Sequence, residues 1–470
     1  MGSKLTTTIW PGGPQWLITK QFAVFGGLVV LCLFIARLVR SRTRQRTTSI
    51  TITHKNGQRL SEIDVRSKKF KSSGQLSRFI KDRAGTLPCL VRTGPNQELV
   101  ISRAQDVQDF YGQDHERYAK LEVSQPGSPF GYVMPGAMVP QSDQDWRKIR
   151  KHFEPLLSSQ AVSRRVPRFT REIKTWIKTL DVGFVESRQT FDLLLFRMMY
   201  LHLYEDAYDD RKYWTLLQLY LLHKKAVEAT QGSAKFAKKF HREWREFSQM
   251  IVEVARNGHW TCPVEVIHRG VRANDMTEEA YLSTLSEIMF SNVESTCQVF
   301  STVFTKLAAN RAIQDALRLE IQVNECAGDV YLHRADTLLH RVLQESLRLS
   351  PPMGFSKPEL TSEAKVIAGY QVPAQTPVVI DAHRTNTDAA TWGPDSEVWD
   401  PDRFLRVDAK ALRRGFIPYG AGAEPCLWKE VADVILKITI TAIVEQISLE
   451  PVGSGEEKGG AADLNMRRLK

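Results

Sequence analysis

The stretch YGAGAEPCLW, residues 419–428, lies near the end of a chain of 470 residues and places Cys426 in a glycine-rich loop. An apolar segment follows this loop directly. A cysteine in such a setting could be a buried thiol, a disulfide partner, a zinc ligand, a nucleophile or an iron ligand. The rest of the chain has to distinguish between these roles.

The other cysteines narrow the choice. The chain has six cysteines, none of them in a CxxC pair, and most lie far apart in the sequence. Zinc knuckles and disulfide-dense secreted scaffolds both require closely spaced cysteines. The pattern therefore favours a reducing compartment and a solitary role for Cys426.

Length and net charge limit the classes of protein to which the chain can belong. The chain is longer than the ~250–300 residues at which single cores stop growing, yet its middle has no linker-like segment and no internal repeat. We therefore expect one large helix-rich domain or two closely packed lobes. The net charge of +11 would suit nucleic acid, anionic lipid or an acidic protein. No basic stretch is interleaved with aromatic residues, so we predict no nucleic-acid binding.

The N-terminal region is typical of a membrane anchor. Residues 22–36, FAVFGGLVVLCLFIA, carry no charge, and five arginines follow between positions 37 and 46. The run is short against the ~20 residues of a full span, and neighbouring apolar residues extend it. A cleaved signal peptide is the alternative, but no A-x-A-like site follows. We predict an anchor and basic stop segment over residues 1–46 and a cytosolic domain over residues 47–470.

Hydrophobic periodicity indicates a mainly α domain with small β-sheets near both ends of the chain. The polar tail from Glu456 onward is expected to fray. A helix of about 30 residues is expected to cross the domain, because such a length corresponds to ~45 Å. The expected elements are strand–turn–strand–helix over 90–112, a helix at 142–159, helices through 190–330 with the long one at 280–310, a helix at 338–349, short strands within 364–381 and a late helix at 429–447.

A charged pair lies within QESLRL, residues 344–349. Glu345 and Arg348 are three residues apart, so both side chains lie on one face of a helix. On a surface such a pair contributes about 0–1 kcal/mol. Leucines crowd this helix, however, and a buried pair needs further partners to be tolerated. Arg403 in PDRF, residues 401–404, is available as that partner.

With these motifs in order, the chain resembles the cytochrome P450 family along most of its length. The ExxR helix corresponds to Glu345–Arg348, and the P-E-R-F-type segment to residues 401–404. The W-x-x-x-R of the family's C helix corresponds to Trp146 and Arg150. The cysteine loop resembles F-x-x-G-x-R-x-C-x-G. Each motif alone is weak evidence for the family. Four motifs in the family's order, behind a membrane anchor and with a long helix between them, are specific evidence for it.

The resemblance implies the cytochrome P450 fold, a single large domain behind an N-terminal transmembrane helix, and a haem (heme, iron protoporphyrin IX) with Cys426 as its metal ligand. Backbone N–H groups of the turn would hold the thiolate charge, and thiolate ligation favours O–O cleavage. Trp146 and Arg150, one helical turn apart, would bind a propionate. Glu345, Arg348 and Arg403 complete the implied cofactor-binding set.

The resemblance also implies catalytic residues on the long helix. Residues 291–296, SNVEST, stand where the family carries A/G-G-x-D/E-T. This places Glu294 at the acid position and Ser295 at the alcohol position, where they would relay protons. The alternatives are a solvated glutamate with a capping serine, and Thr296 as the hydroxyl group.

Three residues of the loop depart from the family pattern. Tyr419 replaces the usual phenylalanine and keeps an aromatic ring. Glu424 stands where an arginine or histidine usually donates to a propionate, and its charge would repel that group. Trp428 stands where glycine lets the next helix approach the porphyrin, so its ring must find room or push the helix out. We therefore expect a haem site weaker than that of a typical member.

The function implied is a membrane-anchored haem-thiolate monooxygenase of the endoplasmic reticulum. It would receive electrons from NADPH–cytochrome P450 reductase and insert one oxygen atom from O2 into a small organic substrate. Residues 355–404 resemble fungal secondary-metabolism (mycotoxin) members, some of which act on diketopiperazines in gliotoxin-type pathways. Four basic residues would suit an acidic partner, unless they are ordinary solvated charges: Arg147, Lys148, Lys151 and Lys429.

Two other functions remain open at this point. One is a P450-fold protein with impaired haem binding or an isomerase-like activity. The other is a membrane-tethered helical scaffold whose cysteine binds nothing.

Overall fold

The structure is a computed structural model. Residues 51–93 and 97–470 form one compact unit, and the account below concerns the described part of that unit. The predicted anchor, residues 1–46, lies outside the described residues. Within the described ranges no helix is long and apolar enough to cross a membrane. Those ranges are 52–70, 72–94, 97–112, 119–120, 137–138, 143–180, 182–205, 210–228, 233–258, 261–360, 363–452 and 463–469.

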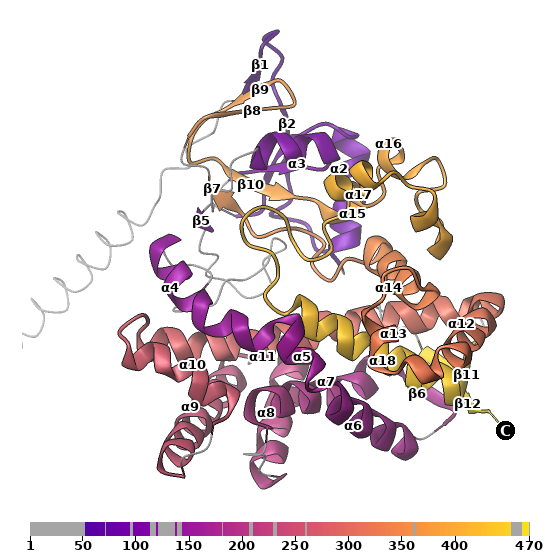
Figure 1. The fold of residues 1–470 in the computed structure, drawn as a ribbon. Coiled ribbons are helices and arrows are strands. Elements are labelled where there is room, and N and C mark those ends of the chain that lie inside the picture. The colour runs from indigo at the N-terminus through magenta and orange to yellow at the C-terminus, as the bar shows by residue number, and fades with distance from the viewer. Residues whose placement is uncertain are drawn as a thin grey trace, which may run out of the picture. The chain divides into compact units, whose positions relative to one another are not determined.

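Helices dominate the unit (Figure 1). The strands of two sheets lie with α2, α3 and α15 at one end of it, whereas β6, β11 and β12 form a third sheet near α12 and α18. The helices are α2 (Ser73–Ala84), α3 (Ala104–Tyr111), α4 (Asp143–Phe153), α5 (Ser159–Ser163), α6 (Val166–Thr179), α7 (Ser187–Tyr204), α8 (Asp210–Glu228), α9 (Ser233–Asn257), α10 (Pro263–Arg272), α11 (Glu278–Ala309), α12 (Arg311–Val323), α13 (Asp329–His333), α14 (Leu338–Leu349), α15 (Ala382–Thr385), α16 (Ala389–Trp392), α17 (Ala409–Gly415) and α18 (Lys429–Gln446), with 3-10 turns η1 (Glu154–Leu157), η3 (Glu325–Ala327) and η4 (Pro401–Leu405).

The described strands form three small sheets. In the six-stranded sheet, β10 pairs parallel to β4, with Val379 opposite Val100, while β3 and β4 are antiparallel. The strand orders are β1 (Thr53–His54), β9 (Tyr370–Val372), β8 (Lys365–Ile367); β2 (Ser61–Asp64), β3 (Cys89–Arg92), β4 (Glu98–Ile101), β10 (Pro377–Ile380), β7 (Glu359–Leu360), β5 (Ala119–Lys120); and β11 (Ile447–Pro451), β12 (Asp463–Arg468), β6 (Phe184–Glu186).

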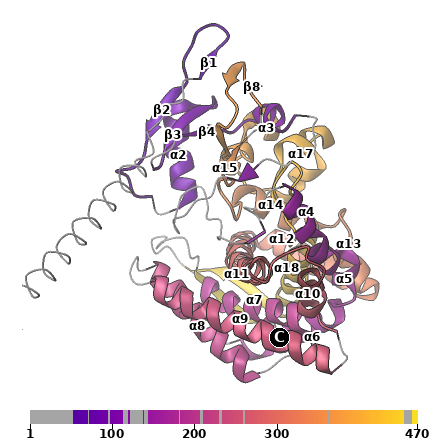
Figure 2. The same ribbon diagram turned by 90° about the vertical axis from the view of Figure 1, so that its left-hand side faces the viewer.

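The long helix is confirmed as α11, with 32 residues. The hydroxyl oxygen of Thr277 accepts a hydrogen bond from the N–H of Ala280 and caps its start, and no glycine or proline interrupts it. Phe191 of α7 stacks on Phe300 and Phe304 of α11, with ring centroids 4.9 and 5.0 Å apart. Figure 2 shows α11 between the end with β2–β4 and the layer formed by α8 and α9. It is therefore an internal element.

The prediction of a mainly α domain with small sheets is confirmed. The prediction of a frayed tail from Glu456 onward is wrong for residues 463–468, while its part at 456–462 lies outside the described residues. Residues 463–468 form β12, which pairs with both β11 and β6. Leu464 and Met466 are fully buried on one face of this strand. Alternating apolar residues therefore close a sheet that the polar composition of the tail concealed.

The predicted charged pair is buried and bidentate. Arg348 donates from Nε to Oε2 of Glu345 at 2.7 Å and from Nη2 to Oε1 at 2.8 Å, and neither side chain is exposed. Arg348 also donates to the carbonyl oxygens of Asn386 and Ser396. Arg403 completes the cluster, because its Nε lies 3.5 Å from Oε1 of Glu345. The expected third partner is confirmed.

This cluster positions a segment with little regular structure. Residues 386–403 contain only α16 and the start of η4. Glu345 accepts from the N–H of Asp400 at 2.9 Å, and Arg403 donates to the carbonyl oxygens of Trp392, Asp395 and Val398. The segment is therefore held against α14 by charged side chains, and it leads through α17 to the Cys426 loop.

We predict that Glu345→Gln lowers the free energy of unfolding by about 3–5 kcal/mol, because it leaves the buried Arg348 charge uncompensated. Denaturant unfolding followed by circular dichroism measures the change. The control is Glu397→Gln, at an exposed carboxylate paired with Lys81, which should stay within about 0.5 kcal/mol. Equal effects of the two substitutions would contradict a special role for the cluster.

Candidate active site

The Cys426 loop closes on itself through its backbone. The N–H of Cys426 donates to the carbonyl oxygen of Tyr419 at 2.8 Å, and its own carbonyl oxygen accepts from Lys429 at 3.3 Å. Gly420 and Gly422 have φ of +86° and +76°, which favours glycine. A Cβ atom on Gly422 would also lie 2.5 Å from the ring of Tyr111. The two glycines are therefore required by the loop's shape.

The surroundings of Cys426 combine solvent access with a large amount of nearby protein. The residue is accessible to solvent and in no disulfide, yet surrounding protein raises the pKa of the thiol above its usual range. The residue is thus accessible although much protein surrounds it, and its surroundings are called the Cys426 recess below. Against this effect, the N–H groups of Trp428 and Lys429 and the charges of Arg150 and Lys357 lower the pKa. These groups offset part of the desolvation, but the net shift of the pKa is upward, so the thiolate would need a further positive partner such as a bound metal ion.

Arg150 reaches the loop from α4, far away in the sequence. Its Nη1 lies 3.3 Å from the carbonyl oxygen of Pro425, and its guanidinium lies 5.1 Å from the ring centre of Trp146, one turn earlier. Trp146 and Ile149 are buried, so α4 is fixed by its apolar face. The structure brings Trp146, Arg150 and Cys426 together, and contact of the first two with a propionate stays a prediction.

Lys357 supplies the second positive charge. Its Nζ lies 3.1 Å from Oε1 of Glu287 on α11, and both side chains are largely buried. Lys357 also lowers the pKa of the Cys426 thiol. This lysine therefore forms an ion pair with α11 and acts on Cys426 through its charge.

The predicted proton-relay residues lie inside α11. Glu294 is exposed, Ser295 is half-buried and Thr296 is buried, only 6% exposed. Ser295 is too far from either end of α11 to cap it, so the capping alternative is wrong. Asn292, in place of the usual glycine, donates to the carbonyl oxygen of Ile288 at 2.7 Å and does not interrupt the helix. The accessible pair is Glu294 and Ser295, whereas Thr296 packs into the core.

Trp428 does not behave as expected. Its indole is buried in the main core, 3% exposed, with its ring centre 5.0 Å from that of His202. The ring has found room, so it does not need to push α18 away from the loop. Trp428→Gly would therefore leave a cavity and destabilise the protein, and the expected weakening of the haem site is left to Glu424 alone.

Sequence reasoning missed Glu287 and His202. Glu287 lies seven residues, two helical turns, before Glu294 and hence on a similar face of α11, a spacing that could have identified it. No sequence feature could have identified His202, because nothing in the sequence places α7 next to the Cys426 loop.

The four basic residues expected at a partner surface all have acidic neighbours. Arg147 pairs with Asp143, Lys148 with Asp145, Lys151 with Asp275 and Lys429 with Glu430, at 2.8 to 3.9 Å. Their positive potential is therefore partly neutralised within the protein.

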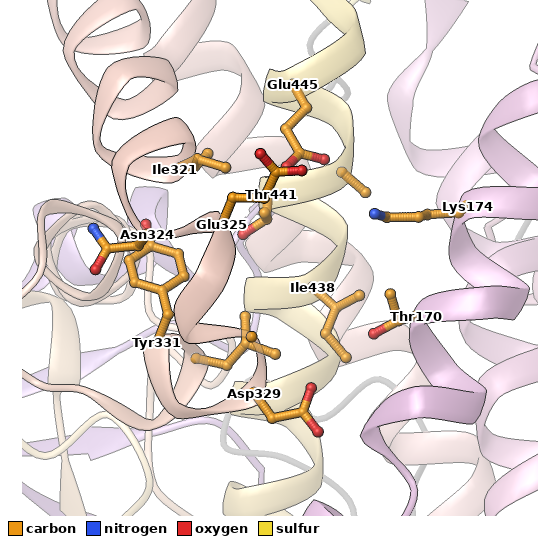
Figure 3. A pocket seen from close by; sticks show the side chains of 13 residues that line it. Thr170, Lys174, Ile321, Asn324, Glu325, Asp329, Tyr331, Ile438, Thr441 and Glu445 are labelled. Carbon is orange, nitrogen blue, oxygen red and sulfur yellow. The ribbon is translucent and has the colours of Figure 1, made fainter.

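A separate hollow of about 150 Å³ lies between α6, α18 and the segment from α12 to α13 (Figure 3). Lys174 points into it from α6, across from Glu325 and Glu445. The residues that line it include none of the predicted site residues, so the Cys426 recess remains the candidate active site.

Comparison with known proteins settles the family. A sequence model described as cytochrome P450 matches residues 88–459. The chain belongs to the cytochrome P450 family. Cytochrome P450 monooxygenase opdB of Penicillium oxalicum is 41% identical over 96% of this chain and 95% of its own length. Cytochrome P450 monooxygenase apdB of Emericella nidulans is 34% identical over 92% of this chain and 93% of its own.

The fold agrees with that assignment. A solved cyanobacterial P450 bound to retinoic acid superposes with a TM-score of 0.68 over 84% of this chain and 95% of its own, at 17% identity. Proteins of this family are oxidoreductases that carry haem with an axial cysteine thiolate, receive electrons from a redox partner and act on small molecules. Family membership leaves no support for the scaffold interpretation.

The residues of the recess fit such a cofactor. A P450 haem needs a thiolate ligand and cationic groups for its propionates. The recess offers Cys426, whose sulfur is stabilised by two backbone N–H groups, together with Arg150 and Lys357. Glu345 and Arg348 hydrogen-bond to each other, Arg403 lies within ion-pair distance of Glu345, and both arginines donate to backbone carbonyl groups. The structure therefore gives the three residues a positioning role, and direct contact with the cofactor stays a prediction.

We predict that Cys426→Ser abolishes the thiolate-type absorption of the reduced carbonyl complex, because an alcohol cannot replace the thiolate as a strong donor. Absorption spectra of the purified protein with and without carbon monoxide provide the measurement. Cys326→Ser, at another accessible cysteine, is the control and should keep the wild-type spectrum. Persistence of the thiolate-type band in Cys426→Ser would identify a different ligand.

We predict that Glu424→Arg raises haem occupancy and slows haem transfer to apomyoglobin. A restored charge-assisted hydrogen bond to a propionate is worth about 1.5–3 kcal/mol, and a like charge is removed as well. Glu397→Arg makes the same change of charge at an exposed site elsewhere and controls for net charge. If haem loss is the same in both variants, Glu424 does not act on the propionates.

Proposed function

We propose that this protein is a single-pass, membrane-anchored monooxygenase that inserts one oxygen atom from O2 into a small organic molecule. The observation that carries the proposal is that Arg150 of α4 reaches the Cys426 loop, with its Nη1 3.3 Å from the carbonyl oxygen of Pro425. The charges of Arg150 and Lys357 both lower the pKa of the Cys426 thiol. When bound there, haem supplies the iron that activates dioxygen.

The chain's own residues then have separate tasks. The thiolate of Cys426 is the proposed ligand, and Arg150, Trp146 and Lys357 orient the cofactor's carboxylates. Glu294 and Ser295 are the proposed proton relay, in which the exposed carboxylate exchanges protons with solvent and the hydroxyl group of Ser295 passes them on. Glu345 and Arg348, with Arg403, position the segment that leads to the loop.

The anchor, partner and substrate extend the proposal. The uncharged run at 22–36 with its following arginines supports attachment to the endoplasmic reticulum membrane, with the catalytic domain in the cytosol. NADPH–cytochrome P450 reductase is the proposed electron donor. The similarity to fungal P450 monooxygenases supports a role in secondary metabolism, for which diketopiperazines are the first substrates to test.

The test is reconstitution of the full chain with reductase, NADPH and ¹⁸O-labelled dioxygen against a panel of diketopiperazines and other small metabolites. A product that carries one labelled oxygen atom and requires NADPH supports the proposal. Conversion of a substrate without consumption of NADPH or O2 would favour the isomerase-like alternative. A chain that binds no haem would favour the alternative of impaired haem binding.

We predict that Glu294→Ala combined with Ser295→Ala slows product formation and raises the share of reduced oxygen released as peroxide, because proton delivery is lost. Peroxide, NADPH and product are measured together. Thr302→Ala is the control, since its hydroxyl group bonds to its own helix at the carbonyl oxygen of Gln298. Unchanged coupling in the double variant would refute the assigned roles.

We predict that removal of residues 1–46 gives a domain that still binds haem but no longer resists extraction from membranes by alkaline carbonate, because the uncharged run is lost. Fractionation of both forms provides the measurement, and the haem spectrum controls for folding. Persistent integral attachment of the shortened chain would place the anchor elsewhere.

A further inference from the structure

A buried histidine lies behind the Cys426 loop. His202 of α7 is completely buried, and among the described residues neither ring nitrogen has a hydrogen-bond partner. Burial and the charge of Arg165 lower the pKa of His202 to about 3, against a smaller opposite effect of the Leu156 backbone, which does not reach hydrogen-bond geometry. The ring is therefore neutral. Unpaired buried polar atoms are costly and rare, so they require an explanation.

The imidazole lies near two aromatic rings. Phe169 of α6 has its ring centre 6.1 Å away. Trp428 meets the imidazole in an edge arrangement, with ring centres 5.0 Å apart and an interplanar angle of 80°. Such edge-to-face contacts are attractive and directional, because the positive edge of one ring faces the negative face of the other.

Trp428 connects the His202 ring contact to the sulfur of Cys426. Its indole is buried against His202, while its backbone N–H is one of the two that lower the pKa of the Cys426 thiol. Its carbonyl oxygen accepts from the N–H of Ala432 at 2.9 Å and starts α18. One residue thus joins the buried ring to the turn around the cysteine, and a shift of the indole moves the peptide group that faces the sulfur.

We propose that His202 is a positioning residue, which holds Trp428 in place and thereby sets the strength of the backbone N–H interactions with the haem-ligating cysteine. The proposal rests on the assignment of Cys426 as that ligand. The family's usual glycine at position 428 has no side chain to be held, so this device is specific to a chain that carries a tryptophan there.

The test compares His202→Leu, which removes the ring, with His202→Phe, which keeps an aromatic edge. The haem reduction potential is measured first, in the full chain with haem bound. Weaker N–H donation leaves more charge on the thiolate and favours the oxidised iron. We expect a more negative potential in His202→Leu and a return toward the wild-type potential in His202→Phe.

The second readout is independent of haem. Hydrogen–deuterium exchange of the peptide that contains residues 427–432 should be faster in His202→Leu than in the wild-type full chain, and slower again in His202→Phe. Phe196→Leu is the matched control, because Phe196 is a buried aromatic residue of the same helix that packs on Tyr213 and Tyr220 of α8. It should lower stability without changing the potential or the exchange of that peptide.

The outcomes separate this inference from the proposed function. If the potential and the exchange in His202→Leu match those of the wild type or of Phe196→Leu, the positioning role is wrong. If Cys426→Ser shows that another residue binds the iron, the proposed site fails, and the exchange data still decide whether His202 holds Trp428.

Discussion

The buried cluster of Glu345, Arg348 and Arg403 is the constraint on which the active site depends. Three ionised groups in a core carry a large desolvation cost, which the protein offsets with two parallel hydrogen bonds inside the pair and several backbone carbonyl acceptors around it. Those carbonyl groups belong to a segment that has little helix or strand to stabilise it. The charged side chains therefore replace regular secondary structure, and the place of the following cysteine loop is set by α14.

The loop in turn gathers charges from distant parts of the chain. α4 brings Arg150 and the segment after α14 brings Lys357, while the helix start at Trp428 and Lys429 supplies backbone N–H groups. These positive groups would offset the charge of a thiolate and of the propionates. Each side-chain cation also pairs with a carboxylate, Arg150 with Glu154 and Lys357 with Glu287 of α11. The charges around Cys426 therefore come from several elements that meet at the loop. The loop itself is short and contributes only the cysteine and its backbone groups.

Departures from the family pattern have unequal consequences. Glu424 changes a charge in the cysteine loop, and its effect on the cofactor stays a prediction. Trp428 points away from the loop into the core, where His202 and the surrounding apolar residues accommodate it. A substitution near a cofactor can therefore act on packing behind the site, and only the side chain's direction distinguishes the two cases.

The sequence by itself determined the helices, because their apolar periodicity and caps are local: Leu338–Leu349 and the long helix through Glu294 lie where the pattern placed them. It also determined the family, because the cysteine loop, the ExxR pair and PDRF occur in a fixed order. The tertiary structure alone decided which side chains meet. The burial of β12, the pairing of Lys357 with Glu287 and the contact between His202 and Trp428 each join residues remote in the chain. Such contacts depend on how packed elements are oriented, and local periodicity carries no information about that orientation.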